Sequence, residues 1–240
     1  MSKKLRIGGA SGFWGDSVIA TPQLLNGNDL DFIVYDYLAE ITMSIMARAR
    51  AKDATKGYAV DFVSSVLKLN LRQIADQKVK ILSNAGGVNP EACAEAIREL
   101  IKELKLDLKV SVVLGDDLMT EKNKFSELNT KEMYSNEDFP AEDKIASINA
   151  YLGAFPIAEA LKSGADIVIT GRSVDSAVTL GACIYAFGWN EKEYDKLAAG
   201  SLAGHIIECG TQSTGGNFTD WELVSKDLHQ IGYPIVEVSE

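Results

Sequence analysis

Short runs of strand-forming residues recur along the chain, and each ends in glycine or polar residues before a helical pattern begins. The runs are apolar throughout instead of alternating, which is typical of strands covered on both faces. Strands that alternate with helices in this way form parallel sheets through right-handed crossovers. The sequence therefore predicts an α/β fold with an open, mostly parallel sheet and helices on both faces, a Rossmann-like three-layer arrangement. The predicted strands are 5–9, 31–36, 79–87, 108–117 and 165–172, with 205–210 as a sixth.

Two of the intervening segments carry clear helix signals. Residues 38–52 have apolar residues at helical spacing and basic residues near the end. Residues 90–104 follow Asn89, a favourable N-cap, and Pro90 stands at the first helical position. By contrast, residues 119–144 are polar, charged and poor in strand formers. We interpret this stretch as a solvated insertion or a lid over the strand ends, within a single α/β domain spanning 1–240.

The charge and the cysteine pattern exclude several classes of protein. A formal net charge of -10 gives no general attraction to nucleic acid or to an anionic membrane. An anionic ligand would need a specific arginine or backbone N–H groups. Cys93, Cys183 and Cys209 are an odd number at wide spacings, which argues against a disulfide framework and a structural zinc site. Without a signal-peptide pattern or a membrane-span window, we expect a cytoplasmic protein.

Polar segments follow the predicted strands, and in open α/β sheets ligands bind where such loops converge. Asp116 and Asp117 come directly after the fourth strand. Adjacent carboxylates can bind a divalent cation or supply a general base, and one can also simply cap the next helix. A metal site would need a further acid from another loop, and Asp175 or Glu208 could supply it. A divalent cation is thus one possible cofactor, and the sequence leaves the cofactor otherwise unknown.

The segment GRSVDSA is the strongest single candidate for a binding loop. Arg172 emerges at a strand end, and Asp175 and Ser176 lie in the turn that follows. A guanidinium there can hold a carboxylate or phosphate in bidentate geometry. The alternative is an internal Arg172–Asp175 ion pair that only fixes the loop.

Three glycine-rich loops are candidates for anion binding through backbone N–H groups. The first resembles a dinucleotide fingerprint with Asp36 as the ribose acid, but Ala10 replaces the first glycine and Phe13 and Trp14 are bulky. Its alternative is a tight turn that places Trp14 over a pocket or in the core. The candidate residues of the three loops are Gly12, Trp14 and Gly15, then Asn84, Gly86 and Gly87, then Thr214, Gly215 and Gly216.

For Cys93 and His205, two residues with potentially reactive side chains, we favour structural interpretations. Cys93 falls in the first turn of a predicted helix, where the dipole could lower its pKa. It shares a helical face with Ile97 and Leu100, however, which predicts a buried thiol. His205 would lie at the start of the sixth strand, too far from Cys209 for a direct nucleophile pair.

A resemblance to a known family runs in order from about residue 5 to residue 238. The strings that carry it include ASGFWGDS, DYLAEITMSIMARARAKD, LSNAGGVNPEACAEAIREL, GDDL, NAYLGAFPIAEALKSGADIVITGRSVDSAVTLG, LAAGSLAGHIIECGTQSTGGNFTDW and IGYPIVEV. These strings are similar to those of the acyclic terpene utilisation (AtuA-like) family. The resemblance implies a part in the breakdown of acyclic terpenes and branched acids, alongside acyl-CoA carboxylation enzymes. Proteins of that family are usually longer, so a homo-oligomer or a partner chain supplying a C-terminal part is expected.

Three functional hypotheses follow from these observations. The first is an enzyme that hydrates, dehydrates or hydrolyses a carboxylate or acyl-CoA intermediate. In it Arg172 holds an anionic group, and Asp116, Asp117 or Asp175 acts as general base or metal ligand. The second is a non-catalytic binding or scaffolding subunit that a partner completes. The third is a nicotinamide-dependent oxidoreductase, which rests on the loop around Gly12 and on Asp36.

Overall fold

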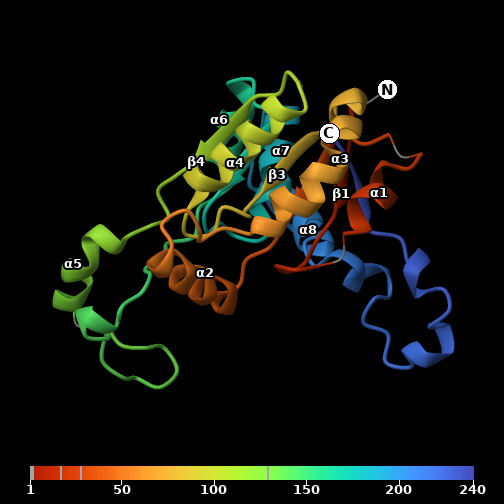
Figure 1. Ribbon diagram of the computed structural model, residues 1–240. Coiled ribbons are helices and arrows are strands. Elements are labelled where there is room, and N and C mark those ends of the chain that lie inside the picture. The colour runs from red at the N-terminus through yellow and green to blue at the C-terminus, as the bar shows by residue number, and fades with distance from the viewer. Residues whose placement is uncertain (1–2, 17, 28, 129) are drawn as a thin grey trace.

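The computed structural model describes residues 3–16, 18–27, 29–128 and 130–240. The chain alternates strands and helices as expected (Figure 1). The strands are β1 (Lys4–Gly9), β2 (Phe32–Tyr35), β3 (Lys80–Ser83), β4 (Val110–Val113), β5 (Ile167–Thr170) and β6 (Ile235–Ser239). The helices are α1 (Ala20–Leu25), α2 (Glu40–Lys52), α3 (Lys68–Gln77), α4 (Pro90–Glu103), α5 (Lys122–Glu127), α6 (Phe155–Lys162), α7 (Ala177–Phe187) and α8 (Tyr194–Ile207).

The strands form one six-stranded sheet in the order β4-β5-β3-β2-β1-β6. Strands β1 to β5 are parallel, and β6 alone pairs antiparallel with β1. The predicted open, mostly parallel sheet is therefore confirmed. Strands β2, β3 and β5 are buried at almost every position, because neighbours pair on both sides and helices cover both faces.

The predicted sixth strand at 205–210 is wrong. Residues up to Ile207 complete α8, and a 3-10 turn begins at Gly210. A short apolar run such as HIIECG fits a strand or the end of a buried helix equally well, and periodicity cannot separate the two. The preceding small and apolar residues continue the helix instead, and Ile207 packs into the core from its last turn.

Each face of the sheet has its own hydrophobic core. Helices α1, α3 and α4 pack on one face, with Leu24, Leu71 and Ile97 among the buried side chains. Helices α6, α7 and α8 pack on the other, with Ile157 and Ile207 in the second core. The predicted coverage of both faces is therefore confirmed, and the three-layer arrangement can be followed in Figure 1.

The direction in which the chain adds successive strands to the sheet reverses between β3 and β5. The connections that leave β1, β2 and β3 run toward the β4 edge, whereas those that leave β4 and β5 run back toward β6. Right-handed connections of opposite direction lie on opposite faces, as the two cores require. The loops after β3 and β5 therefore separate at the carboxyl ends of these strands, which is the usual place for a ligand in an open α/β sheet.

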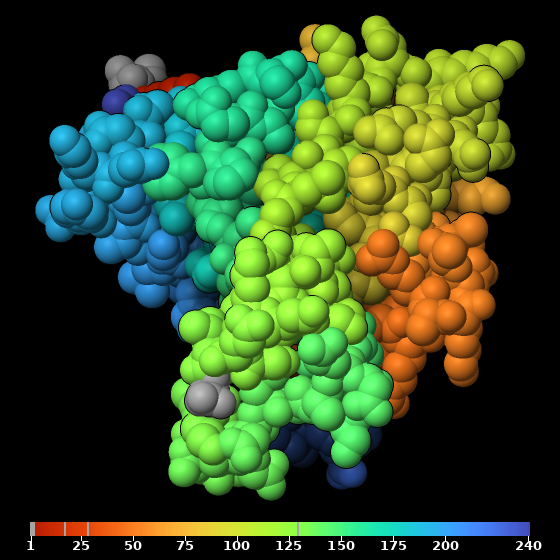
Figure 2. Space-filling view, turned by 90° about the vertical axis from the view of Figure 1, so that its left-hand side faces the viewer, coloured from red at the N-terminus to blue at the C-terminus, as the bar shows by residue number. Residues whose placement is uncertain are grey.

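Two long excursions leave the carboxyl end of the sheet on either side of α2 (Figure 1). Residues 119–128 and 130–144 project as a lobe that carries α5, and most of their side chains are exposed (Figure 2). Hydrogen bonds from Leu118 N to Ile148 O and from Ala150 N to Asp116 O, both 2.8 Å, close the base of this lobe. The second excursion covers 210–232 and consists of turns. That 119–144 acts as a lid stays a prediction.

The two helices that the sequence predicted are present as α2 and α4, with one difference at the N-cap of α4. Helix α4 begins at Pro90 as predicted, and Asn89 occupies the N-cap position. Its side chain, however, donates to Ala54 O and Lys56 O, at 2.9 and 2.8 Å, instead of to the helix. Among the described residues, no helix is both long and apolar enough to cross a membrane.

Candidate functional site

Three carboxylates from distant parts of the chain meet at the carboxyl edge of the sheet. Asp36 follows β2, Asp175 lies between β5 and α7, and Glu208 caps the end of α8. One carboxylate oxygen of each lies within 4.8 Å of the others. We call these three residues the acidic centre. It lies beside the point at which the connections of the sheet reverse direction.

Asp36 is held in place by the strand next to its own. The side chain of Asn84, which follows β3 and is fully buried, donates to Asp36 Oδ1 at 2.5 Å and accepts from Tyr37 N at 2.8 Å. Leu38 N also donates to Asp36 Oδ1, at 3.2 Å. Burial raises the pKa of Asp36 to about 7, since the hydrogen bond from Asn84 offsets only part of the desolvation and nearby Asp175 adds repulsion. Asn84, predicted to bind an anion, thus positions Asp36.

Glu208 brings one satisfied and one unsatisfied oxygen to the acidic centre. Its Oε1 lies 2.7 Å from His205 Nδ1, one helical turn earlier in α8. Its Oε2 is buried and has no hydrogen-bond partner in the part of the chain that the structure describes. Burial raises the pKa of Glu208, and Asp175 contributes further in the same direction. Because α8 replaces the predicted strand, His205 pairs with Glu208.

Arg172 lies beside the acidic centre and is only 3% exposed. Its Nη1 donates to Asp175 Oδ1 at 2.6 Å and to Ser173 O at 3.0 Å. Its guanidinium carbon lies 4.0 Å from the ring centroid of Tyr151, and Nη2 lies 3.7 Å from Glu40 Oε1 at the start of α2. The internal Arg172–Asp175 ion pair that the sequence offered as the alternative is therefore present. A role for Arg172 in holding a ligand stays a prediction.

Asp116 and Asp117 have separate surroundings, although they are adjacent in sequence. Asp116 is buried, and its Oδ2 accepts from Arg172 N at 2.8 Å and from the side chain of Asn149 at 2.9 Å. Burial raises the pKa of Asp116. The Asp116 carboxylate thus links the loop after β4 to the loop after β5. Asp116 is not one of the three residues of the acidic centre, which contains Asp36 instead. Asp117 is half-exposed and lies 3.6 Å from Arg50 of α2.

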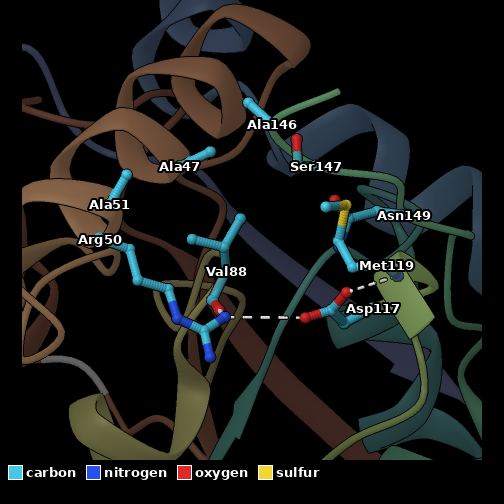
Figure 3. A pocket seen from close by; sticks show the side chains of 9 residues that line it. All are labelled: Ala47, Arg50, Ala51, Val88, Asp117, Met119, Ala146, Ser147 and Asn149. Carbon is cyan, nitrogen blue, oxygen red and sulfur yellow. Dashed lines mark hydrogen bonds and ion pairs between the residues drawn. The ribbon is translucent and has the colours of Figure 1, made fainter. Parts of the chain in front are cut away.

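An open pocket of about 320 Å³ surrounds the Arg50–Asp117 ion pair (Figure 3). Helix α2 forms one wall, and residues 146–149 at the base of the lobe form another. Figure 3 shows Arg50 and Asp117 facing each other across the pocket, with alanine and methionine side chains around them. Arg50 Nη1 also donates to Val88 O, so its guanidinium is anchored but remains partly exposed. The lining is Ala47, Arg50, Ala51, Val88, Asp117, Met119, Ala146, Ser147 and Asn149.

The first glycine loop packs against the protein instead of opening toward a ligand. A Cβ at Gly12 would lie 2.8 Å from the backbone of Cys209, so the loop after β1 fits closely against the segment that carries Glu208. Trp14 packs against the core, and its Nε1 donates to Asp61 Oδ1 at 2.5 Å. Gly15 has a φ of 90°. The tight-turn alternative agrees with this geometry, and the Gly12 N–H is already bonded to Asp16 Oδ2 at 2.9 Å.

The second glycine loop is likewise engaged internally. Gly87 N donates to Asn84 O at 3.2 Å, and Asn89 N donates to Gly86 O at 2.9 Å. An anion bound by this turn would have to displace the first of these bonds. Anion binding by Gly86 and Gly87 stays a prediction.

The remaining predicted binding residues are Ser176, next to Asp175 in the sequence, and the third glycine loop. Ser176 is the N-cap residue of α7, and its backbone contacts α8 closely at Gly204. Thr214 Oγ1 donates to Gly232 O at 2.6 Å, and Gly216 N donates to Thr211 O at 2.6 Å. Gly215 and its neighbours are exposed within the second excursion. These residues stay candidates without a further contact that indicates a ligand.

The cysteines are free thiols in this structure. Cys93 is fully buried, as the sequence predicted, and burial raises the pKa of its thiol far above the usual range. Cys209 is half-buried, and its pKa is raised first by burial and then by the neighbouring carboxylates. Neither environment favours a reactive thiolate.

Comparison with known families gives a match over nearly the whole chain. The model of the acyclic terpene utilisation family protein AtuA matches residues 5–240. The chain belongs to the AtuA family. No curated protein and no solved structure matches it. Family membership associates the chain with acyclic terpene utilisation, and it assigns no role to any side chain.

In this AtuA family member, sequence reasoning missed two features of the site. It treated Asp36 only as a ribose acid, although the position directly after a buried strand was a signal for the acidic centre. It passed over Arg50, because an arginine near the end of an amphipathic helix normally faces solvent. Only the placement of α2 across the edge of the sheet brings Arg50 to Asp117.

Proposed function

We propose that the chain is an enzyme, or the site-bearing part of one, in the breakdown of branched-chain or terpenoid acids. Its substrate is a carboxylate or acyl-CoA intermediate, and the reaction is a hydration, dehydration or hydrolysis. One observation carries the proposal. Two features lie along the same helix, α2, at the edge of the sheet where ligands usually bind. One is the pocket that contains Arg50, and the other is the largely buried acidic centre.

The separation of the two features favours a long substrate. Glu40, which approaches Arg172 beside the acidic centre, and Arg50 in the pocket are ten residues apart on α2. At about 1.5 Å per residue, that corresponds to about 15 Å along the helix. A thioester on a pantetheine arm can bridge this distance, with an anionic group at Arg50 and the acyl group at the acidic centre. A small free acid can occupy only one of the two.

The acidic centre supplies the chemistry that these reactions need. Hydration, dehydration and hydrolysis all add or remove water, so each needs groups that orient a water molecule beside the substrate. Asp175 is the most exposed of the three carboxylates, with 41% of its side chain accessible, and can accept hydrogen bonds from such a water. Arg172 fixes the position of Asp175.

Replacing Arg50 by alanine is the direct test of substrate binding. We expect the dissociation constant for isovaleryl-CoA, measured by isothermal titration calorimetry, to rise about 10- to 100-fold, because a charge-assisted hydrogen bond contributes about 1.5–3 kcal/mol. Arg48→Ala is the matched control, since Arg48 is exposed on the same helix and lies outside the pocket. Equal affinities in the wild type and in Arg50→Ala would contradict this assignment.

A second candidate function is a binding subunit that requires a partner chain. The observation that favours it is exposed apolar surface in the second excursion, where Phe218, Trp221 and Leu223 are 46%, 53% and 83% exposed. We expect light scattering after gel filtration to show an assembly that Trp221→Ser with Leu223→Ser dissociates. A monomer at all concentrations, unchanged by these substitutions, would exclude self-association through this surface.

A further inference from the structure

The acidic centre presents a set of ligands that hard cations prefer. Asp36, Asp175 and Glu208 each offer a carboxylate oxygen, and these oxygens lie within 4.8 Å of one another. Oxygens bound to one Ca²⁺ at about 2.4 Å lie at most about 4.8 Å apart, and those bound to one Mg²⁺ at about 2.1 Å lie at most about 4.2 Å apart. The observed spacing is therefore close to what one Ca²⁺ or Mg²⁺ needs, after a small contraction of the carboxylates around the ion.

A second observation, independent of the clustering, points to a positively charged ligand. The side chain of Glu208 is 92% buried, as its 8% exposure shows, and Oε2 has no hydrogen-bond partner among the described residues. An ionised carboxylate oxygen without a donor is costly to bury. The neighbouring carboxylates cannot satisfy it, because they too are acceptors when ionised.

The charge of the surroundings matches a divalent ion. Three carboxylates face one guanidinium, that of Arg172, which is already bonded to Asp175. When all four groups are ionised, the local charge is that of two uncompensated carboxylates. Asn84 donates to Asp36, and His205 contacts Glu208 Oε1. Such outer partners commonly fix the orientation of metal-binding carboxylates.

We propose that Asp36, Asp175 and Glu208 bind one divalent cation of the hard class, Ca²⁺, Mg²⁺ or Mn²⁺, at the carboxyl ends of β2 and β5. The site contains only oxygen ligands, which favours these ions over zinc or copper. The proposed ligands include Asp36 and exclude Asp116, because the Asp116 carboxylate is hydrogen-bonded to Arg172 N and Asn149. The proposal shares the acidic centre with the proposed function, but it concerns binding of the ion alone, so either can fail without the other.

The test is isothermal titration of the EDTA-treated and desalted full chain with CaCl₂, MgCl₂ and MnCl₂ in turn. We expect one equivalent to bind, and we expect Asp36→Asn and Glu208→Gln each to weaken binding at least 10-fold. The control is Asp107→Asn, because Asp107 is an exposed aspartate that precedes β4, at the other end of the strands. It should leave the affinity unchanged.

A second readout keeps the test decisive if the two buried variants do not fold. Asp175→Asn keeps an Oδ1 acceptor for Arg172 Nη1, and it should still weaken cation binding because it removes a charged ligand. Loss of the free Mn²⁺ signal in electron paramagnetic resonance reports binding without relying on heat. The proposal is overturned if the wild type binds none of the three ions at millimolar concentration, or if Asp175→Asn binds as tightly as the wild type.

Discussion

Replacing Arg172 by alanine is expected to lower the free energy of unfolding by about 3–5 kcal/mol, because it removes a buried cation and leaves its partner groups unpaired. The substitution deletes charge-assisted hydrogen bonds to Asp175 and Ser173 and the stacking on Tyr151. A hydrogen bond to a charged group contributes about 1.5–3 kcal/mol and a desolvated cation–π contact about 2 kcal/mol, and contributions within one network do not add in full. The measurement is urea denaturation in EDTA, since a bound cation would offset part of the lost charge.

Two further variants show whether the effect comes from the geometry of Arg172. Arg172→Lys keeps the charge but not the planar fork, so it should recover only part of the stability. Arg98→Ala removes an arginine that is half-exposed and pairs with Glu95 at 3.2 Å, and should cost less than about 1 kcal/mol. If Arg172→Ala costs no more than Arg98→Ala, the network around Arg172 does not stabilise the fold.

Gly86→Ala is expected to destabilise the protein by about 3 kcal/mol, at the upper end of the cost of overpacking. A Cβ at position 86 would overlap the carbonyl oxygen of Thr170 and would lie 2.6 Å from Pro90 Cβ. Thr170 O belongs to the backbone at the end of β5, which the sheet holds on both sides, so no flexible side chain can move away. The turn after β3 must shift instead, at the place where the connections of the sheet reverse direction.

Gly153→Ala is the matched control for Gly86→Ala. A Cβ at Gly153 would meet no atom within 4 Å among the described residues. Its backbone is not in the left-handed region, so alanine should be neutral or stabilising by about 0.4–1 kcal/mol through the unfolded state. Thermal denaturation of the two variants side by side checks the pair. Similar melting temperatures for both would mean that the β3–α4 turn can relax without cost.

The strands that the sequence predicted well are those whose environment is uniform. Strands β1 to β5 are short and apolar, and each lies within or overlaps a predicted run. Strand β6 was missed because it is an antiparallel edge strand whose residues are half-buried or exposed, so IVEVS carries no continuous apolar signal. The run at 205–210 was misassigned because local hydrophobicity does not distinguish the last turn of a buried helix from a strand.

The candidate site was predicted in outline and revised in detail. The sequence named Asp175 or Glu208 as the further acid of a metal site with Asp116, and both lie in the acidic centre, although Glu208 follows a helix and not the predicted strand. It could not choose between Asp36 and Asp116, because both follow a strand. The choice depends on the lateral order of the strands: β2 and β5 flank β3, whereas β4 lies at the edge of the sheet.

The sequence by itself determined the class of fold, the two covered faces of the sheet and the edge at which polar residues gather. It could do so because periodicity, caps and strand-end polarity are local properties of the chain. Only the tertiary structure decided that Asp36, Asp175 and Glu208 face one another and that Arg50 faces Asp117. These contacts join residues far apart in the sequence, and they depend on the order of strands and the placement of helices, which no local pattern encodes.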